Sequence, residues 1–199
     1  MPSVKRDLPV LAFKSQRARD TWLASQPAQS KGLWLKLAKK SSGMASVSKV
    51  EALDTALCHG WIDGQLESFD DDFWLIRFTP RQATSKWSEK NRIRALELVE
   101  LKLMRPAGLE QIERARRDGR WEAAYAPQSK AQIPEDLRAA LARNKKARSF
   151  FEGLDSHNRY AILYRLQDAK KAETRAARLE KFVAMLVDGK TIHPRKVKA

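Results

Sequence analysis

The feature that most limits the fold of this chain is a pair of apolar stretches, residues 61–69 and 73–79, separated by Asp70, Asp71 and Asp72. Two such stretches around a short polar turn are typical of a β-hairpin. Counting outward from the turn places Leu66 opposite Ile76, which assigns five apolar side chains to one face: Ile62, Leu66, Trp74, Ile76 and Phe78. A hairpin with one apolar face needs further elements to cover it, so this segment predicts a sheet that packs against helices.

The opposite face of the hairpin is largely polar. There, Asp63 and Glu67 lie diagonal to Arg77, within reach for charge pairing across the strands. Because Pro80 has no amide hydrogen to donate, we expect the second strand to end there. Residues 33–38 have the apolar density of a further strand, so we expect a small antiparallel sheet of at least three strands. Residues 1–12 show no strong period, and we expect no regular element in them.

Helix start signals lie on both sides of the hairpin. Ser48 and Glu51 form a capping box, in which each side chain binds a free amide at the helix start, and the helix runs to about His59. Its buried stripe is predicted to consist of Val50, Leu53 and Leu57. A further helix is predicted to end at about Leu103, with either Ser88 or Ser85 as its cap. Other helices are predicted over about residues 15–25, 106–119, 134–144, 145–152, 156–168 and 171–187.

These elements predict an α+β fold. The N-terminal region, residues 1–88, combines the small antiparallel sheet with helices, and residues 89–199 are all helical. No stretch approaches the roughly 18 apolar residues of a membrane span. The basic N-terminus is not followed by an apolar core, so we expect no secretory signal and a cytoplasmic location.

Positive charge is concentrated in the second half of the chain. The chain holds 39 Lys and Arg residues against 24 Asp and Glu, a formal net charge of +15. Residues 138–148 contain five basic residues and no acidic one, and Lys190, Arg195, Lys196 and Lys198 add charge near the C-terminus. A field of this sign attracts nucleic acid, anionic lipid headgroups or acidic proteins, and the alternative interpretation is an ordinary solvated surface.

The densest cluster of polar and aromatic residues extends from the hairpin into the next helix. Arginine forks fit carboxylate and phosphate groups, a helix start near Ser88 offers free amides, and Trp87 offers a stacking surface. We therefore predict a pocket for a small anionic ligand or a nucleotide, lined by Asp63, Arg77, Arg81, Trp87, Ser88, Asn91 and Arg92. The alternative is structural, with the arginines paired to acids, Ser88 a helix cap and Trp87 part of the core.

Other reactive residues do not indicate catalysis. Cys58 and His59 are adjacent, so on a helix their side chains point about 100° apart and form no thiolate–imidazole pair. We expect a buried, unreactive thiol. The three aspartates of the turn lack the further ligands of a calcium loop, and the three scattered histidines lack the spacing of a zinc site. We therefore expect no cofactor, no metal ion and no catalytic residue.

A second candidate surface lies on the predicted helix 171–187. Its apolar arc consists of Ala172, Ala176, Leu179, Val183 and Leu186. A basic stripe of Lys171, Arg175 and Arg178 runs beside this arc and is suited to follow a phosphate backbone. The stripe predicts non-specific nucleic-acid binding as an alternative function, and the other interpretation is an amphipathic helix docked on its neighbours.

Five segments of the chain resemble the YdeI/OmpD-associated family, whose members are often labelled bacteriocin-protection proteins. They read ALCHGWIDG at 56–64, RFTPR at 77–81, WSEKNR at 87–92, MRPAGL at 104–109 and AKKAETR at 169–175. The resemblance spans about residues 13–190, with the helical OmpD-associated part at about 130–190, and His59 stands where an apolar residue is usual. It implies a link to the cell envelope or to resistance against antibacterial agents, and no established reaction or cofactor.

These observations lead to three functional hypotheses. The first is a non-enzymatic cytoplasmic protein of this family that binds a partner or an anionic ligand in envelope or antibacterial-stress physiology. The second is a non-specific nucleic-acid-binding protein that uses the basic C-terminal half, and the third is an enzyme with a site between the two halves. A small anion, an acidic protein and a nucleic acid are all compatible with the charge.

Overall fold

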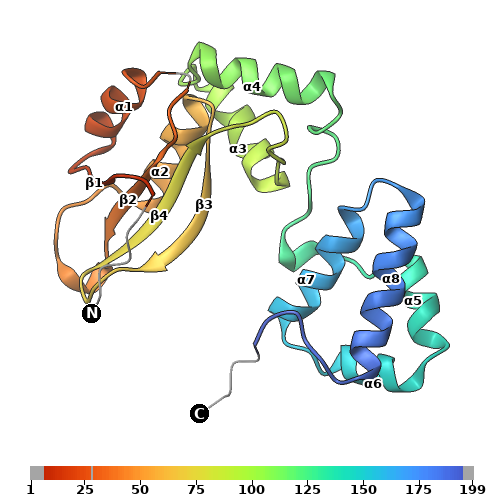
Figure 1. The fold of residues 1–199 in the computed structure, drawn as a ribbon. Coiled ribbons are helices and arrows are strands. Elements are labelled where there is room, and N and C mark those ends of the chain that lie inside the picture. Colours follow the sequence, from red (N-terminus) through yellow and green to blue (C-terminus); the bar gives the residue numbers. More distant parts are fainter. Residues whose placement is uncertain (1–6, 28, 195–199) are drawn as a thin grey trace. The chain divides into compact units, whose positions relative to one another are not determined.

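The computed structural model describes residues 7–27 and 29–194 of the chain. The basic residues Arg195, Lys196 and Lys198 lie outside the described residues, as do residues 1–6. The chain divides into two compact units, Met1–Ala124 and Tyr125–Ala199, which we call the N-terminal unit and the C-terminal unit (Figure 1). The N-terminal unit contains the sheet and the C-terminal unit is helical, so the predicted α+β fold is confirmed.

The sheet of the N-terminal unit has the strand order β1-β2-β4-β3. The predicted strands are present as β2 (Leu33–Ala38), β3 (Trp61–Ser68) and β4 (Phe73–Pro80), which pair antiparallel. The expectation of no regular element before residue 13 is wrong, because β1 (Val10–Ala12) adds to the edge of the sheet, parallel to β2. Three residues are too few to show a period, and β1 exists only through its pairing with β2.

The hairpin of β3 and β4 pairs as predicted near the turn but not along its whole length. Leu66 lies opposite Ile76, and a register shift between Asp63 and Leu66 then places Asp63 opposite Phe78. Asp63 forms no ion pair with a described residue, so the predicted charge pair with Arg77 is not formed. A bulge of this kind inserts an unpaired residue, which a count from the turn alone does not detect.

Two side chains of the hairpin lie in the opposite environment from the predicted one. Leu66, assigned to the core, is 55% exposed. Leu75, assigned to the polar face, is fully buried and packs with Leu8 and Trp34. The N-terminal segment therefore covers part of the second face of the sheet, and neither face is purely polar.

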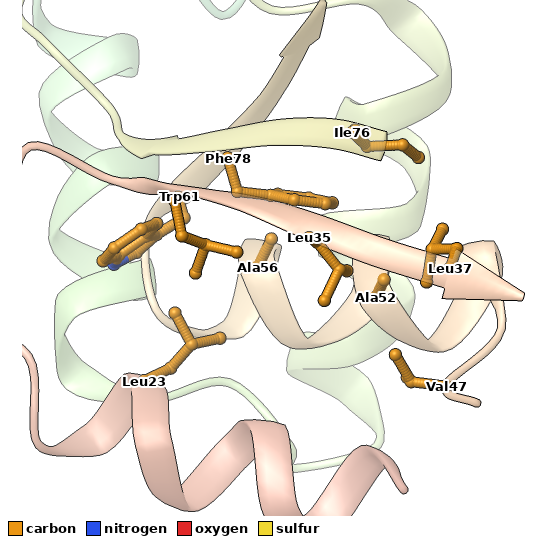
Figure 2. Packing of buried hydrophobic residues seen from close by; sticks show 10 residues of the cluster. Leu23, Leu35, Leu37, Val47, Ala52, Ala56, Trp61, Ile76 and Phe78 are labelled. Atoms are coloured by element: carbon orange, nitrogen blue, oxygen red, sulfur yellow. The ribbon is translucent and has the colours of Figure 1, made fainter. Parts of the chain in front are cut away.

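The main core of the N-terminal unit lies between the sheet and two helices, α1 (Gln16–Ala24) and α2 (Lys49–Cys58). Figure 2 shows Leu23 of α1 and two small residues of α2, Ala52 and Ala56, near Leu35 and Phe78 of the sheet. Small residues on α2 let the helix approach the strands closely, while Leu and Phe side chains fill the remaining space.

The start of α2 confirms the predicted capping box, but its buried face differs from the prediction. Ser48 accepts a hydrogen bond from the Glu51 amide and the Glu51 side chain accepts one from the Ser48 amide. Val50, predicted to be buried, is 65% exposed. Because α2 contacts β3, α1, α3 and α4, its buried residues extend around most of the helix after the first turn, where Val50 faces solvent.

Two more helices complete the N-terminal unit, α3 (Glu89–Glu100) and α4 (Pro106–Arg117). They pack on α2 through a second cluster that includes Leu57, Cys58, Leu98 and Ile112. The helix predicted to reach residue 103 ends at Glu100, because Lys102 adopts a left-handed backbone conformation with φ of 58°.

The N-terminal unit also buries a charged side chain in its core. Arg19 of α1 is fully buried and donates from Nη1 to the Ala52 carbonyl oxygen at 2.5 Å. Its guanidinium carbon lies 4.4 Å from the centre of the Phe78 ring. Burial lowers the pKa of Arg19 to about 10, because the charged form loses its hydration. Nε and Nη2 meet no acceptor on a described residue.

The C-terminal unit consists of four main helices: α5 (Glu135–Ala142), α6 (Lys145–Glu152), α7 (Ser156–Gln167) and α8 (Ala172–Val187). These bounds agree with the predicted ranges to within two residues. Their core is a separate cluster that includes Leu137, Phe151, Ile162, Leu166 and Phe182. A short 3-10 turn, η2 (Gln128–Lys130), precedes them, and another, η1 (Lys40–Ser42), follows β2 in the N-terminal unit.

The buried face of α8 is rotated relative to the predicted arc. Ala172 and Ala176, predicted to be buried, are exposed, whereas Phe182 and Leu186 are buried. The rotation follows from Arg175 and Arg178, which donate to carbonyl oxygens at the end of α7. These hydrogen bonds hold the face of α8 that carries the two arginines against α7. No helix within the described ranges is both long and apolar enough to span a bilayer.

Candidate anion-binding site

Part of the cluster predicted to hold an anionic ligand packs into the interior of the N-terminal unit. Arg81 is 4% exposed, and its guanidinium carbon lies 3.7 Å from the centre of the Trp87 ring. Trp87 is 2% exposed and meets the edge of Trp121, with ring centroids 4.8 Å apart. Arg92 donates from Nη1 to the Trp121 carbonyl oxygen at 3.1 Å. These contacts hold the loops around α3 together and leave the Trp87 ring covered.

The remaining residues of that cluster lie in three other places. Ser88 accepts a hydrogen bond from the Asn91 amide at 3.1 Å and is the N-cap of α3. Arg77 lies on β4 and donates to the Asp7 carboxylate at 3.1 Å. Asp63 lies on β3, with Phe78 as its cross-strand neighbour. The structure thus brings Arg81, Trp87 and Arg92 together at Trp121, while Arg77 joins the N-terminal segment.

The arginines of the stripe predicted on α8 are engaged within the C-terminal unit. Arg175 donates to both carboxylate oxygens of Asp136, at 2.6 and 2.9 Å, and from Nη1 to the Leu166 carbonyl oxygen. Arg178 donates to the Arg165 carbonyl oxygen at 2.6 Å. Both arginines therefore donate to carbonyl oxygens in the last turn of α7. The hydrogen bonds from Arg175 hold the pKa of Asp136 below its usual range.

Exposed positive charge without an ion pair gathers instead where α5 meets α6. We call Arg143, Lys145, Lys146 and Arg148 the basic corner. All four are exposed, and none forms an ion pair with a residue that the structure describes. The sequence feature behind it is the acid-free run between Asp136 and Glu152. The basic corner is therefore open to an external anion.

Beside the basic corner lies a cavity of about 310 Å³ between α5, α6 and the start of α7. Its apolar lining comes from Ile133, Leu141 and Phe151. Its charged lining comes from Arg138, Arg148, Arg159 and Glu152. The residues come from three helices and the loop before α5, so sequence reasoning did not find this cavity. A concave apolar surface with a few convergent polar groups is the usual form of a small-molecule site.

The structure also reveals a charged cluster that the sequence did not predict. His59 Nε2 lies 2.7 Å from one oxygen of Asp20, and Arg105 Nη2 donates to the other at 2.9 Å. Burial alone raises the pKa of Asp20, but the hydrogen bonds from His59 and Arg105 outweigh it and hold the pKa below its usual range. The partners lie 39 and 85 positions from Asp20, so no local pattern indicates them. This cluster connects α1, the end of α2 and the residue that precedes α4.

Two residues considered for reactive chemistry have structural surroundings. Cys58 is buried, and burial raises the pKa of its thiol to about 11, so it is protonated at neutral pH. Asp70 accepts hydrogen bonds from the amides of Asp72 and Phe73 and stabilises the hairpin turn. Within residues 7–27 and 29–194, no group of three or more His, Cys, Asp or Glu side chains is arranged to hold a metal ion.

The fold and these sites define a two-unit α+β protein whose helical unit carries the basic corner. A family model described as a domain of unknown function (DUF8412) matches residues 11–111, half of the chain, and the chain belongs to this family. A second model, described as "Bacteriocin-protection, YdeI or OmpD-Associated", matches residues 130–189, which confirms the predicted family resemblance for the C-terminal unit. No curated protein and no solved structure matches the chain.

Proposed function

We propose that this protein acts by binding rather than by catalysis, and that its C-terminal unit captures an anionic ligand or acidic partner. The family description for residues 130–189 supports a role in envelope or antibacterial-stress physiology, and we place that role in the cytoplasm. The protonated thiol of Cys58 and the pairing of His59 with Asp20 favour a structural use of the residues best suited to chemistry.

The observation that carries this proposal is the basic corner. The C-terminal unit contains 17 Lys and Arg residues against 8 Asp and Glu. Several of these basic residues are neutralised internally, as Arg175 is by Asp136. The four residues of the basic corner are not neutralised by any described acid, so they form the strongest attraction for a negative partner that this unit offers.

The proposal is tested by fluorescence anisotropy of a labelled oligoglutamate peptide titrated with the full-length chain. In one variant, Arg143→Gln, Lys145→Gln and Lys146→Gln remove three charges from the basic corner. The matched control, Lys170→Gln, Lys171→Gln and Lys181→Gln, removes the same charge from exposed positions elsewhere in the unit. We expect about tenfold weaker binding by the corner variant, little change in the control, and weaker binding at about 0.15 M salt, where charges are screened beyond about 8 Å.

Three results would contradict this proposal. Absence of binding by the unmodified chain at low salt would remove the basic corner as an interface for acidic partners. Equal losses in the two variants would mean that the peptide responds to total charge and not to a surface. A loss confined to the control variant would move the interface to the neighbourhood of Lys171 on the edge of α8.

A second candidate function is non-specific nucleic-acid binding through the same surface. The favouring observation is that the basic corner lies within the acid-free run from Arg138 to Arg148, which suits a continuous phosphate backbone. With labelled mixed-sequence DNA, log affinity should fall steeply with log salt, and the corner variant should reduce that slope by about three charge units. Stronger binding of oligoglutamate than of DNA and RNA at equal salt would decide for an acidic partner.

A further inference from the structure

We propose that the cavity between α5, α6 and the start of α7 binds a monocarboxylate with an apolar body. This inference rests on the proposed function, since such a carboxylate is one form of the anionic ligand, and it adds a defined site and a ligand class. The apolar lining of Ile133, Leu141 and Phe151 accepts the body of the ligand, and the arginines at the cavity accept its charge.

Arg159 is held in place before any ligand arrives. Its Nη2 donates to the carbonyl oxygens of Glu152 and Leu154, at 2.9 and 3.2 Å, which anchors the guanidinium group beside the cavity. A preorganised arginine loses little freedom on binding.

The other two arginines at the cavity are available to a ligand. Arg148 is exposed and has no ion pair with a described residue. Arg138 binds Glu135 at 2.6 Å, but both side chains are exposed, so this pair is weak and easily exchanged. Glu152 lines the cavity and Glu135 pairs with Arg138, so two acidic side chains accompany the three arginines. A ligand with a single negative charge balances the one positive charge that remains, and a multiply charged phosphate exceeds it.

The volume of the cavity limits the size of the ligand. About 310 Å³ corresponds to roughly ten water molecules at about 30 Å³ each. This volume suits a ligand of about ten non-hydrogen atoms, and octanoate has that size. The carboxylate would lie at the arginines and the chain would cover Leu141 and Phe151. A ligand with the same tail but no charge, or the same charge but no tail, uses only half of the site.

Isothermal titration calorimetry with the full-length chain tests this inference. The probes are octanoate, 1-octanol and acetate, which separate the contributions of tail and charge. We expect saturable one-to-one binding of octanoate, and at least tenfold weaker binding of the other two. Arg148→Gln should weaken octanoate binding about tenfold. Lys181→Gln, which removes one charge from an exposed position of α8 outside the cavity lining, should leave it within about twofold. Ala142→Trp should block the cavity without changing the net charge.

Several outcomes would overturn the inference. These are no octanoate binding, equal binding of octanoate and 1-octanol, or equal effects of Arg148→Gln and Lys181→Gln. The oligoglutamate experiment keeps the two proposals apart, because it depends on Arg143, Lys145 and Lys146. If oligoglutamate binds and octanoate does not, only the cavity assignment fails. If neither probe binds and nucleic acid does not bind either, the proposed function fails with it.

Discussion

A methyl group added at Gly108 should destabilise the N-terminal unit. Gly108 lies in α4, where it faces the end of α2. A Cβ atom at this position would lie 2.4 Å from the Cys58 carbonyl oxygen, 2.7 Å from the Leu57 carbonyl oxygen and 2.5 Å from Met104 Sδ. The thioether of Met104 is flexible, but the two carbonyl oxygens are backbone atoms, so α4 must move away from α2.

The expected magnitude follows from two opposing contributions. Overpacking of this kind costs about 3 kcal/mol at the upper end of its usual range, because rigid backbone lies on the blocked side. Replacing glycine by alanine within a helix returns about 1 kcal/mol. We therefore expect Gly108→Ala to lower the free energy of unfolding by about 2 kcal/mol and the midpoint temperature by about 8 °C.

The assay is urea unfolding followed by tryptophan fluorescence. All six tryptophans lie before residue 125, so this signal reports the N-terminal unit alone. The matched control is Gly64→Ala on β3, where an added Cβ meets Arg77 at 3.7 Å or more and should change the stability by less than about 0.5 kcal/mol. The reasoning is refuted if Gly108→Ala is as stable as the unmodified chain or as the control.

Three further predictions concern charged side chains in the two units. Arg19→Met should raise the stability of the N-terminal unit by about 1 kcal/mol at neutral pH, because it removes a buried charge. The folded pKa of Arg19 lies below its unfolded value, so the destabilisation by that charge persists until pH rises past about 10. Equal losses of stability in Arg19→Met and Arg19→Ala, measured by urea unfolding, would contradict this prediction. Asp54→Asn should lower the free energy of unfolding by about 2 kcal/mol, because the buried carboxylate accepts hydrogen bonds from Arg94 at 2.7 and 2.8 Å. A double-mutant cycle with Arg94→Gln should show coupling between the two residues, and additive effects would refute the pairing. The pair of Asp136 with Arg175 should stabilise the C-terminal unit above the unfolded pKa of the Asp136 carboxyl group, and this stabilisation should be lost as pH falls through the lowered folded pKa. Asp136→Asn should weaken the dependence of stability on acid pH, with unfolding followed by tyrosine absorbance. An unchanged dependence in this variant would count against the prediction.

Helix positions and the sheet strands were largely predictable from local sequence. The cap of α2 depends on Ser48 and Glu51, which are three residues apart, and similar caps at Ser88, Asn144 and Asp155 begin α3, α6 and α7. Interactions of this range form in any context, so their patterns carry over to the folded chain. The hairpin register failed at the bulge after Asp63, because a bulge depends on what packs against the strand.

The candidate site was predictable only in part. The acid-free run from Arg138 to Arg148 pointed to the basic corner, because a lack of nearby acids is visible in the sequence. The cavity was not predictable, since Leu141, Phe151 and Arg159 come from three helices and meet only when the helices pack. For the same reason, the stripe on α8 gave no sign that its arginines end on α7 and Asp136.

The sequence by itself thus determined the approximate positions of the main helices and of strands β2, β3 and β4, that the fold is α+β, and that excess positive charge lies in the second half. Tertiary structure decided which charges remain available. Arg175 is neutralised by an acid 39 positions away, whereas Lys145 and Lys146 meet no described acid. The physical reason is range: capping and turn contacts act over three or four residues, while burial and ion pairing depend on side chains that only the packed helices bring together.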